Sequence, residues 1–277
     1  GTGLMGNRRH ARRVLVLSAG YVLLVVLLSL LAPYVTSYDP LVIDGSNTLA
    51  PPSLQHLFGT DEFGRDILTR LLYGGQPSII VAVGATTLSL VLGVPLGLIA
   101  GYFTGWTEQL IMRFNDTLLT FPPILLAMVV VGFLKTGIVP LIITIGVLYA
   151  STFARLAYAT TLQVKQNEYL LAAQAIGAGH LHRIRYCILP NITSALIVQV
   201  SLTVAAVILL ESGLSFLGLG IVPPTPSWGL MIGAARSYMF QSPTYVIFPA
   251  LVVATVVLAV NTFGDALRDV LDPRSRS

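Results

Sequence analysis

The sequence predicts an all-α protein whose helices cross a membrane six times. Hydrophobic residues make up 55% of the 277 residues and charged residues only 10%, and the mean hydropathy is +0.80. A soluble domain with so few charges would precipitate or assemble. Apolar stretches of about 20 residues, the length that a membrane-spanning helix needs, recur along the chain. These observations predict a polytopic membrane protein rather than one with a single anchor.

The first predicted span covers residues 14 to about 33. A group of arginines between positions 8 and 13 precedes it directly. Because such charges resist translocation, this end of the span is expected in the cytoplasm. The polar segment 34–75 is then expected outside. Apolar residues between 67 and 72 share one side of a helix, which predicts a short helix at the membrane face.

The second predicted span, residues 78–102, carries Gly93, Gly97 and Gly101 at intervals of four. Small residues on one face allow two helices to pack closely in a membrane. Two partners for this glycine ridge are open. Another helix of the same chain is favoured, and a second subunit is the alternative.

The third and fourth spans are predicted on either side of a short external turn. The third covers about 118–135 and follows a short cytoplasmic link. Pro122 and Pro123 predict a kink in it, since proline lacks the backbone donor that a regular helix needs. The fourth span is predicted over 139–153 and leaves the membrane at Arg155.

The fifth span is predicted over 192–210 and the sixth over 245–263, joined by a proline-rich external segment. Trp228 in that segment suits the membrane interface. Basic residues favour the cytoplasmic side of membrane proteins, so the distribution of lysine and arginine tests the predicted six-span topology. The lysines and arginines left outside are Arg65, Arg70, Lys135 and Arg236. The net charge of +4 therefore reflects topology, and nucleic-acid binding is not expected.

The polar, basic stretch between the fourth and fifth spans contains two short helical pieces. Asn167 is predicted to cap the first, which starts at Glu168. Two glycines, Gly177 and Gly179, end it. Pro190 disfavours a helical conformation at the residue before it, and is expected to separate the second piece from the fifth span.

This cytoplasmic stretch resembles the "EAA" loop in the membrane subunits of ATP-binding-cassette (ABC) importers. The matching residues are the pair Ala172 and Ala173, then Gly177, then the pair Leu189 and Pro190. Two positions depart from the family pattern: Leu171 stands where glutamate is usual, and Cys187 where isoleucine is usual. The acidic residue is instead Glu168, which is similar to the variant in dipeptide, oligopeptide and nickel importers.

Other motifs extend this resemblance over nearly the whole chain beyond the first span. They lie at residues 58–74, 214–220 and 264–273. Together they resemble the second permease subunit of a dipeptide, oligopeptide or nickel importer. The resemblance implies the type-1 transmembrane fold of ABC transporters. It divides the chain into a first part (1–76: cytoplasmic arm, first helix and external segment), a transmembrane core (77–268) with a coupling loop (156–191), and a cytoplasmic tail (269–277).

The same resemblance implies the partners and the coupling residues. A second related permease, two cytoplasmic ATP-binding subunits and an extracytoplasmic solute-binding protein are expected, in the inner membrane of a prokaryote with both termini cytoplasmic. The coupling loop would seat on an ATPase subunit. The residues implied in this contact are Glu168, Ala172, Ala173, Gly177, Leu189 and Pro190.

The chain itself is expected to bind no nucleotide and no other cofactor. A phosphate-binding loop needs a Gly-Lys pair, but Leu134 and Val164 precede the two lysines. ATP would therefore be bound by partner subunits, and no catalytic arrangement for an enzyme is apparent. His180 and His182 do not predict a metal site, because residues two apart do not share a helix face.

Two residues are candidates for the transport pathway or its gate. Glu211 is predicted near the outer end of the fifth span, where it lines a gate or is satisfied by backbone groups at a helix break at Gly213. Gln199, in the same span, lines a polar pathway or bonds to neighbouring helices. The alternative function is an ion-coupled secondary transporter, which would require a charged site at mid-membrane. Short peptides, nickel or a metal chelate are the expected substrates, with a glutathione-type peptide less favoured.

Overall fold

The computed structural model of the chain describes residues 2–271, with side chains described from His10 onward. Within this part the chain forms helices and irregular segments, without a β-strand. The elements are α1 (Thr2–Leu30), α2 (Ala32–Val35), α3 (Ile67–Tyr102), α4 (Trp106–Leu119), α5 (Pro123–Leu134), α6 (Ile138–Val164), α7 (Glu168–Ala175), α8 (His180–His182), the π-helix η1 (Arg183–Ile188), α9 (Leu189–Phe216), α10 (Trp228–Ala235), the 3-10 helix η2 (Arg236–Tyr238) and α11 (Pro243–Leu271).

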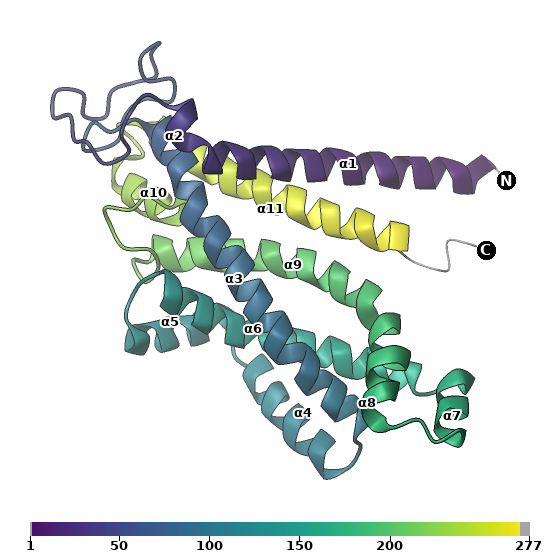
Figure 1. Ribbon diagram of the computed structural model, residues 1–277. Helices are drawn as coiled ribbons and strands as arrows, with labels where there is room; N and C mark the ends of the chain where they lie inside the picture. Colours follow the sequence, from purple (N-terminus) through teal and green to yellow (C-terminus); the bar gives the residue numbers. More distant parts are fainter. Residues whose placement is uncertain (1, 272–277) are drawn as a thin grey trace.

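The long helices form a bundle with two distinct ends. Figure 1 shows the axes of α1, α11, α9 and α6 roughly aligned, with neighbouring chain directions often opposed, while α3 crosses them obliquely. The start of α1, the end of α11 and α7 lie at one end of the bundle, and α2, α10 and the segment 36–66 lie at the other (Figure 1). The start of the first long helix, the end of the last one and the polar loop are thus at the same end of the described bundle, while residues 272–277 of the predicted tail lie outside the described residues.

Helix α3 is longer than the sequence suggested. The short helix expected at the membrane face is not separate, because it forms the first turns of this 36-residue helix. Asp66 caps its start by accepting a hydrogen bond from the Thr69 N–H at 2.8 Å. At 1.5 Å per residue the helix is about 54 Å long, more than the hydrocarbon thickness of a bilayer. Residues 76 and 77, where the first part of the chain was expected to end, lie inside it.

The glycine ridge of α3 packs against α6. A methyl group added at Gly97 would overlap the carbonyl oxygen of Ala154, and Gly93 and Gly101 meet α6 in the same way. The favoured prediction of packing within the chain is confirmed. The two backbones are therefore in direct contact along this line of glycines, which we call the α3–α6 seam.

The third predicted span, 118–135, is mostly the 12-residue helix α5, which is separate from α4, and not one kinked helix. Helices α4 and α5 are bent by 94° at their junction. Pro122 has an extended backbone (φ −57°, ψ 126°), since the proline after it disfavours a helical conformation there. The described residues therefore contain five helices long and apolar enough to cross a membrane, or six if this bent pair is one span. The predicted cytoplasmic link is mostly α4 itself.

Helix α6 runs well beyond the end predicted for the fourth span. Arg155 lies inside it and forms an ion pair with Asp116 of α4. One turn later, Tyr158 donates a hydrogen bond to Glu108 of α4. These two contacts give α6 polar partners past the predicted exit and hold α4 alongside it.

The predicted break before Pro190 is wrong. The chain is helical without interruption from His180 to Phe216. Pro190 cannot donate to a carbonyl one turn back, and its ring would crowd that carbonyl in a regular helix. The π-helix η1 directly precedes this region and widens the turns there. The proline thus changes the type of helix and does not end it.

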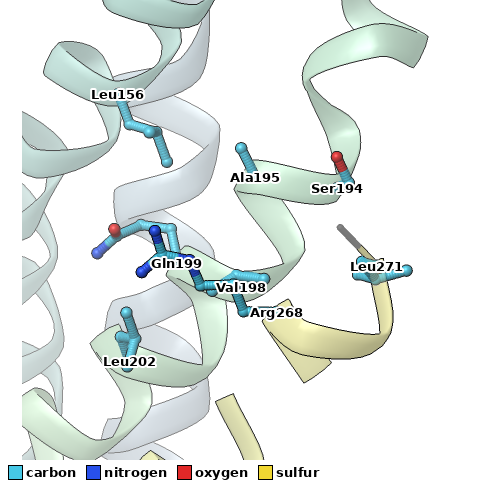
Figure 2. A pocket seen from close by; sticks show the side chains of 8 residues that line it. All are labelled: Leu156, Ser194, Ala195, Val198, Gln199, Leu202, Arg268 and Leu271. Carbon is cyan, nitrogen blue, oxygen red and sulfur yellow. The ribbon is translucent and has the colours of Figure 1, made fainter. Parts of the chain in front are cut away.

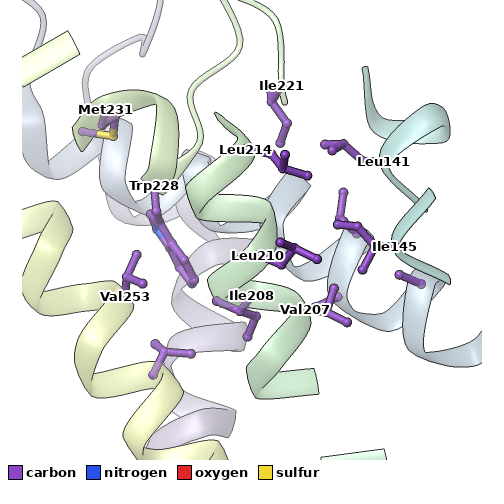
Figure 3. Packing of buried hydrophobic residues seen from close by; sticks show 14 of the residues in the cluster. Leu141, Ile145, Val207, Ile208, Leu210, Leu214, Ile221, Trp228, Met231 and Val253 are labelled. Carbon is purple, nitrogen blue, oxygen red and sulfur yellow. The ribbon is translucent and has the colours of Figure 1, made fainter. Parts of the chain in front are cut away.

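Two apolar cores hold the bundle. Figure 3 shows the larger core, at the α10 end of the bundle, which we call the outer core after the predicted topology. Trp228 of α10 points between α9 and α11. The tryptophan is 1% exposed, and its Nε1–H donates to the Leu71 carbonyl at 2.9 Å, so its predicted interface position is wrong. Ser227 caps α10 and turns it back into the bundle. The second, inner core includes Phe153 and Ile188 and lies at the α7 end.

The segment between α2 and α3 is a folded lobe. Asp61 is fully buried and accepts a hydrogen bond from Nε of Arg65 at 2.7 Å. Phe58 stacks on Phe248 of α11, with ring centroids 3.9 Å apart. These contacts fix the lobe on the outer ends of the helices.

Candidate functional site

The polar loop between α6 and α9 is built around one helix and one glycine turn. The non-helical connections that hold it lie at 165–167 and 176–179, since 156–164 belong to α6 and 189–191 to α9. Helix α7 begins at Glu168 as predicted, after Asn167 with an extended backbone (φ −79°, ψ 137°). The Asn167 side chain makes no cap, however, and donates from Nδ2 to the Tyr169 hydroxyl at 3.3 Å.

Gly177 ends α7 in the way that the sequence predicts. Its φ is +80°, a conformation that favours glycine. The N–H of Gly177 donates to the Gln174 carbonyl and that of Ala178 to the Ala173 carbonyl, both at 3.0 Å. This pair of bonds is the Schellman motif, which closes the helix and reverses the chain direction.

The loop presents apolar side chains away from the bundle. Leu171 is 59% exposed, Ile176 85% and Leu181 76%. Glu168 and Ala172 are exposed on the same helix, and Ala173 is half-buried. By contrast, Leu170 is buried in the inner core. The loop is thus anchored by Leu170 of α7, and it exposes Leu171 of α7, Ile176 directly after α7 and Leu181 of α8, which we call the apolar face of the loop.

The structure places the remaining two loop residues elsewhere. Leu189 and Pro190 lie at the start of α9, beyond η1. Leu189 packs against the inner core, and Pro190 is exposed. The six candidate residues therefore do not form one patch: four belong to α7 and its turn, and two belong to the helix that carries the loop.

Glu211 is fully buried in the outer half of α9. It accepts hydrogen bonds from the Ser78 hydroxyl of α3 at 3.0 Å and from the Ser215 hydroxyl at 2.7 Å. The predicted helix break at Gly213 is wrong, since α9 continues to Phe216. The carboxyl group is satisfied by hydroxyl groups rather than backbone, and no sequence pattern pointed to Ser78.

Gln199 lines a pocket between α6, α9 and α11. Its volume is about 360 Å³, and Figure 2 shows Gln199 and Arg268 extending into it beside Leu156 and Leu202. The Gln199 Nε2 group also donates to the Thr203 hydroxyl at 3.2 Å. Gln199 lies about 18 Å along α9 from Glu211, because 12 residues of helix separate them. The two pathway candidates therefore do not share a site.

The two histidines of the loop make different contacts. His180 Nδ1 lies 2.8 Å from the Tyr102 hydroxyl at the end of α3, and the His182 ring packs against that of Tyr186. Over the residues with described side chains, no group of three or more His, Cys, Asp or Glu could hold a metal ion.

Comparison with known proteins gives one family and a set of similar permeases. Residues 93–277 match the family "Binding-protein-dependent transport system inner membrane component". The chain is 38% identical to a di/tripeptide transport system permease protein of Pseudomonas aeruginosa (strain UCBPP-PA14), over 93% of this chain and 87% of that protein. It is 40% identical to a dipeptide transport system permease protein of Alkalihalophilus pseudofirmus, over 91% and 83%. A glutathione transport system permease protein of Escherichia coli O157:H7 is 41% identical, over 96% and 89%.

Two solved structures share the arrangement of helices. A chain of an inward-facing MetNI methionine ABC transporter matches with a TM-score of 0.61 and 15% identity, over 74% of this chain and 96% of that chain. A chain of an amino acid ABC transporter with histidines matches with a TM-score of 0.54 and 12% identity, over 74% and 94%. At these identities the likeness concerns the fold alone.

Proposed function

This chain belongs to the family of inner membrane components of binding-protein-dependent transport systems, and we propose that it is the second permease subunit of an ATP-driven importer of short peptides. Its fold is that of ABC transporter membrane subunits. It is a multi-pass protein of a bacterial inner membrane, and its family consists of transporter permeases rather than enzymes. Such permeases work with ATP-binding subunits and a binding protein.

Short peptides are the substrates that the relatives favour. Two of the similar permeases are named for di- and tripeptides. A third is named for glutathione, which is itself a tripeptide and was the less favoured expectation. Nickel and metal chelates stay as alternatives that no observation on this chain favours. Within the proposed complex, the binding protein would supply most of the selectivity.

The apolar face of the loop supports the proposed contact with an ATPase subunit. A loop at the aqueous end of a membrane protein gains nothing from exposing Leu171, Ile176 and Leu181 unless a partner covers them. Small residues such as Ala172 and Ala173 let that partner approach the backbone closely. This apolar face is the observation that carries the proposal, and Leu170 would transmit the contact into the inner core.

The proposed complex contains this chain, a second related permease, two ATPase subunits and a solute-binding protein. ATP binds to the ATPases, and this chain holds no cofactor. The start of α1, the end of α11 and α7 lie at one end of the bundle (Figure 1), which we assign to the cytoplasm. Glu211 would tie helices near the outer gate, and Gln199 would line a pocket at the inner half of the pathway.

Site-specific photo-crosslinking in the assembled complex tests the coupling assignment. Benzoylphenylalanine at Ile176 should give a light-dependent adduct with an ATPase subunit. The same group at Leu54, which is 98% exposed in the lobe at the opposite end, should give none. An intact complex without an adduct at position 176 would contradict the assignment. Peptide uptake that survived ATP depletion but not collapse of the ion gradient would instead support an ion-coupled transporter.

A further inference from the structure

A compact cluster joins the loop to two of the long helices. Tyr102 is the last residue of α3, Lys165 follows α6 directly, His180 begins α8, and Arg183 begins η1. We call these four residues the inner brace. The brace adjoins the apolar face of the loop, since Leu181 lies between His180 and Arg183, but no part of the proposed function uses the four brace residues.

The tyrosine is the centre of the inner brace. Its hydroxyl lies 2.8 Å from Nδ1 of His180, and its ring lies 5.5 Å from the Arg183 guanidinium carbon. Lys165 donates from Nζ to the carbonyls of Gly101 and Tyr102, both at 3.1 Å. These carbonyls end α3 and have no partners within that helix. Lys165 therefore ties the end of α6 to the end of α3.

The contacts of His180 require its neutral form. The Arg183 Nη2 group lies 3.1 Å from the same Nδ1. Because a guanidinium group only donates hydrogen bonds, Nδ1 must be the acceptor and must carry no proton. The Tyr102 hydroxyl is then a second donor, and the two donors share the single lone pair of Nδ1. A proton on Nδ1 would remove the hydrogen bond from Arg183, turn the Tyr102 hydroxyl from donor into acceptor, and place a second cation beside Arg183.

The polar groups around His180 come from several elements. Tyr102 of α3 and Arg183 of η1 contact the ring itself, while Lys165 at the end of α6 reaches the Tyr102 carbonyl. His182 of α8 packs against Tyr186 instead. Within residues 10–271, no carboxylate lies within 4 Å of a nitrogen of His180, Lys165 or Arg183. Arg183 also has a buried Nε without a hydrogen-bond partner, so its guanidinium depends on the ring of Tyr102 and on neutral His180.

We infer that Tyr102 and neutral His180 are positioning residues that transmit movement of the coupling loop to α3, so that coupling weakens when His180 gains a proton. The inference rests on the proposed function, since it assumes that an ATPase moves the loop. The Leu170 anchor would carry movement into the inner core. The inner brace would carry the movement of the loop to α3. From there it would pass along the contact between α3 and α6 to the outer half of the bundle.

The test is the pH profile of coupling in the complete complex in liposomes. The measured quantity is ATP hydrolysis with a binding protein loaded from a mixture of di- and tripeptides, divided by basal hydrolysis. For the wild-type chain this ratio should fall about fivefold as the pH falls from about 7.5 to about 5.5, the range in which imidazoles titrate. A wild-type ratio that does not change over this range overturns the inference.

Three variants distinguish a positioning role of the inner brace from a role in the stability of the protein alone. His180→Asn places an amide oxygen as many bonds from the backbone as Nδ1 and cannot gain a proton, so its ratio should stay high at low pH. His182→Asn removes the other histidine of the loop and should keep the wild-type profile. Tyr102→Phe keeps the ring beneath Arg183 but loses the hydroxyl, and its ratio should be about fivefold lower even at high pH.

The crosslink at Ile176 distinguishes failure of this inference from failure of the proposed function. If the adduct with the ATPase forms and His180→Asn follows the wild-type profile, the inner brace has no positioning role although the loop still couples. If the adduct is absent from an intact complex, the coupling assignment itself fails, and the inference fails with it.

Discussion

At Gly177, one residue determines the shape of the coupling loop. Its φ of +80° favours glycine, yet a Cβ there would meet nothing within 4 Å. Gly177→Trp should therefore strain the turn by about 1 kcal/mol without disturbing the bundle. We expect normal membrane insertion and loss of substrate-stimulated ATP hydrolysis in the reconstituted complex.

Gly179 provides the matched control for this prediction. It also has free space around it, but its φ of −65° suits any residue. Gly179→Ala should insert normally and keep most of the stimulation. Full stimulation in a stably inserted Gly177→Trp protein would count heavily against the role of the loop.

Glu211 allows a second test at the scale of one side chain. Because it bonds to two hydroxyl groups, Glu211→Gln can keep both contacts, with its amide donating to one and accepting from the other. We expect a loss of stability below about 1 kcal/mol for Gln, and of about 2 to 4 kcal/mol for Glu211→Ala, which leaves a cavity and unpaired hydroxyls.

Thermal unfolding in detergent and peptide uptake together measure these variants. The expected outcome is a stable Gln variant with nearly normal uptake, as a helix-tying role requires. A stable Gln variant that fails to transport would show instead that the carboxyl group itself acts in the pathway.

At the scale of elements, the α3–α6 seam is a contact of backbone on backbone. Gly97→Leu would force the two backbones apart, because a Cβ there overlaps the carbonyl of Ala154. We expect the protein to lose about 3 kcal/mol of stability and to accumulate less in the membrane. Gly132→Leu in α5 is the control, since nothing lies within 4 Å of its Cβ position. Equal accumulation of the two variants would argue against a stabilising role for the close packing of α3 on α6.

The elements also show where sequence patterns mislead. Hydropathy located the five long apolar helices among the described residues, but it placed their ends at the ends of apolar runs. Helix α6 continues past Arg155 because Asp116 pairs with that arginine, and α9 continues past Pro190 because a π-helix precedes it. Two consecutive prolines predicted a kink, whereas the chain bends by 94° between α4 and α5. In each case a distant or compensating contact decides the boundary.

At the scale of the whole molecule, the two ends of the bundle predict opposite sides of the membrane. Single cysteines at Leu54 and Ile176, in a Cys187→Ser background, place one probe at each end, 98% and 85% exposed. A membrane-impermeant maleimide should label position 54 in spheroplasts, and position 176 only after permeabilisation. Labelling of position 176 from outside would reverse the assigned topology and remove the ATPase contact.

By itself, the sequence determined the structural features that depend on residues close together in the chain. Apolar runs, arginines beside the first span, the glycine that turns the chain after α7 and the small residues of the α3 ridge each act within a few residues, so their consequences can be read locally. Only the tertiary structure decided which distant groups meet. Ser78 reaches Glu211 across 133 residues and Tyr102 reaches His180 across 78, while Trp228 turns inward to Leu71. Side-chain hydrogen bonds of this kind form wherever packing brings a donor to an acceptor, and their spacing in the sequence follows no period.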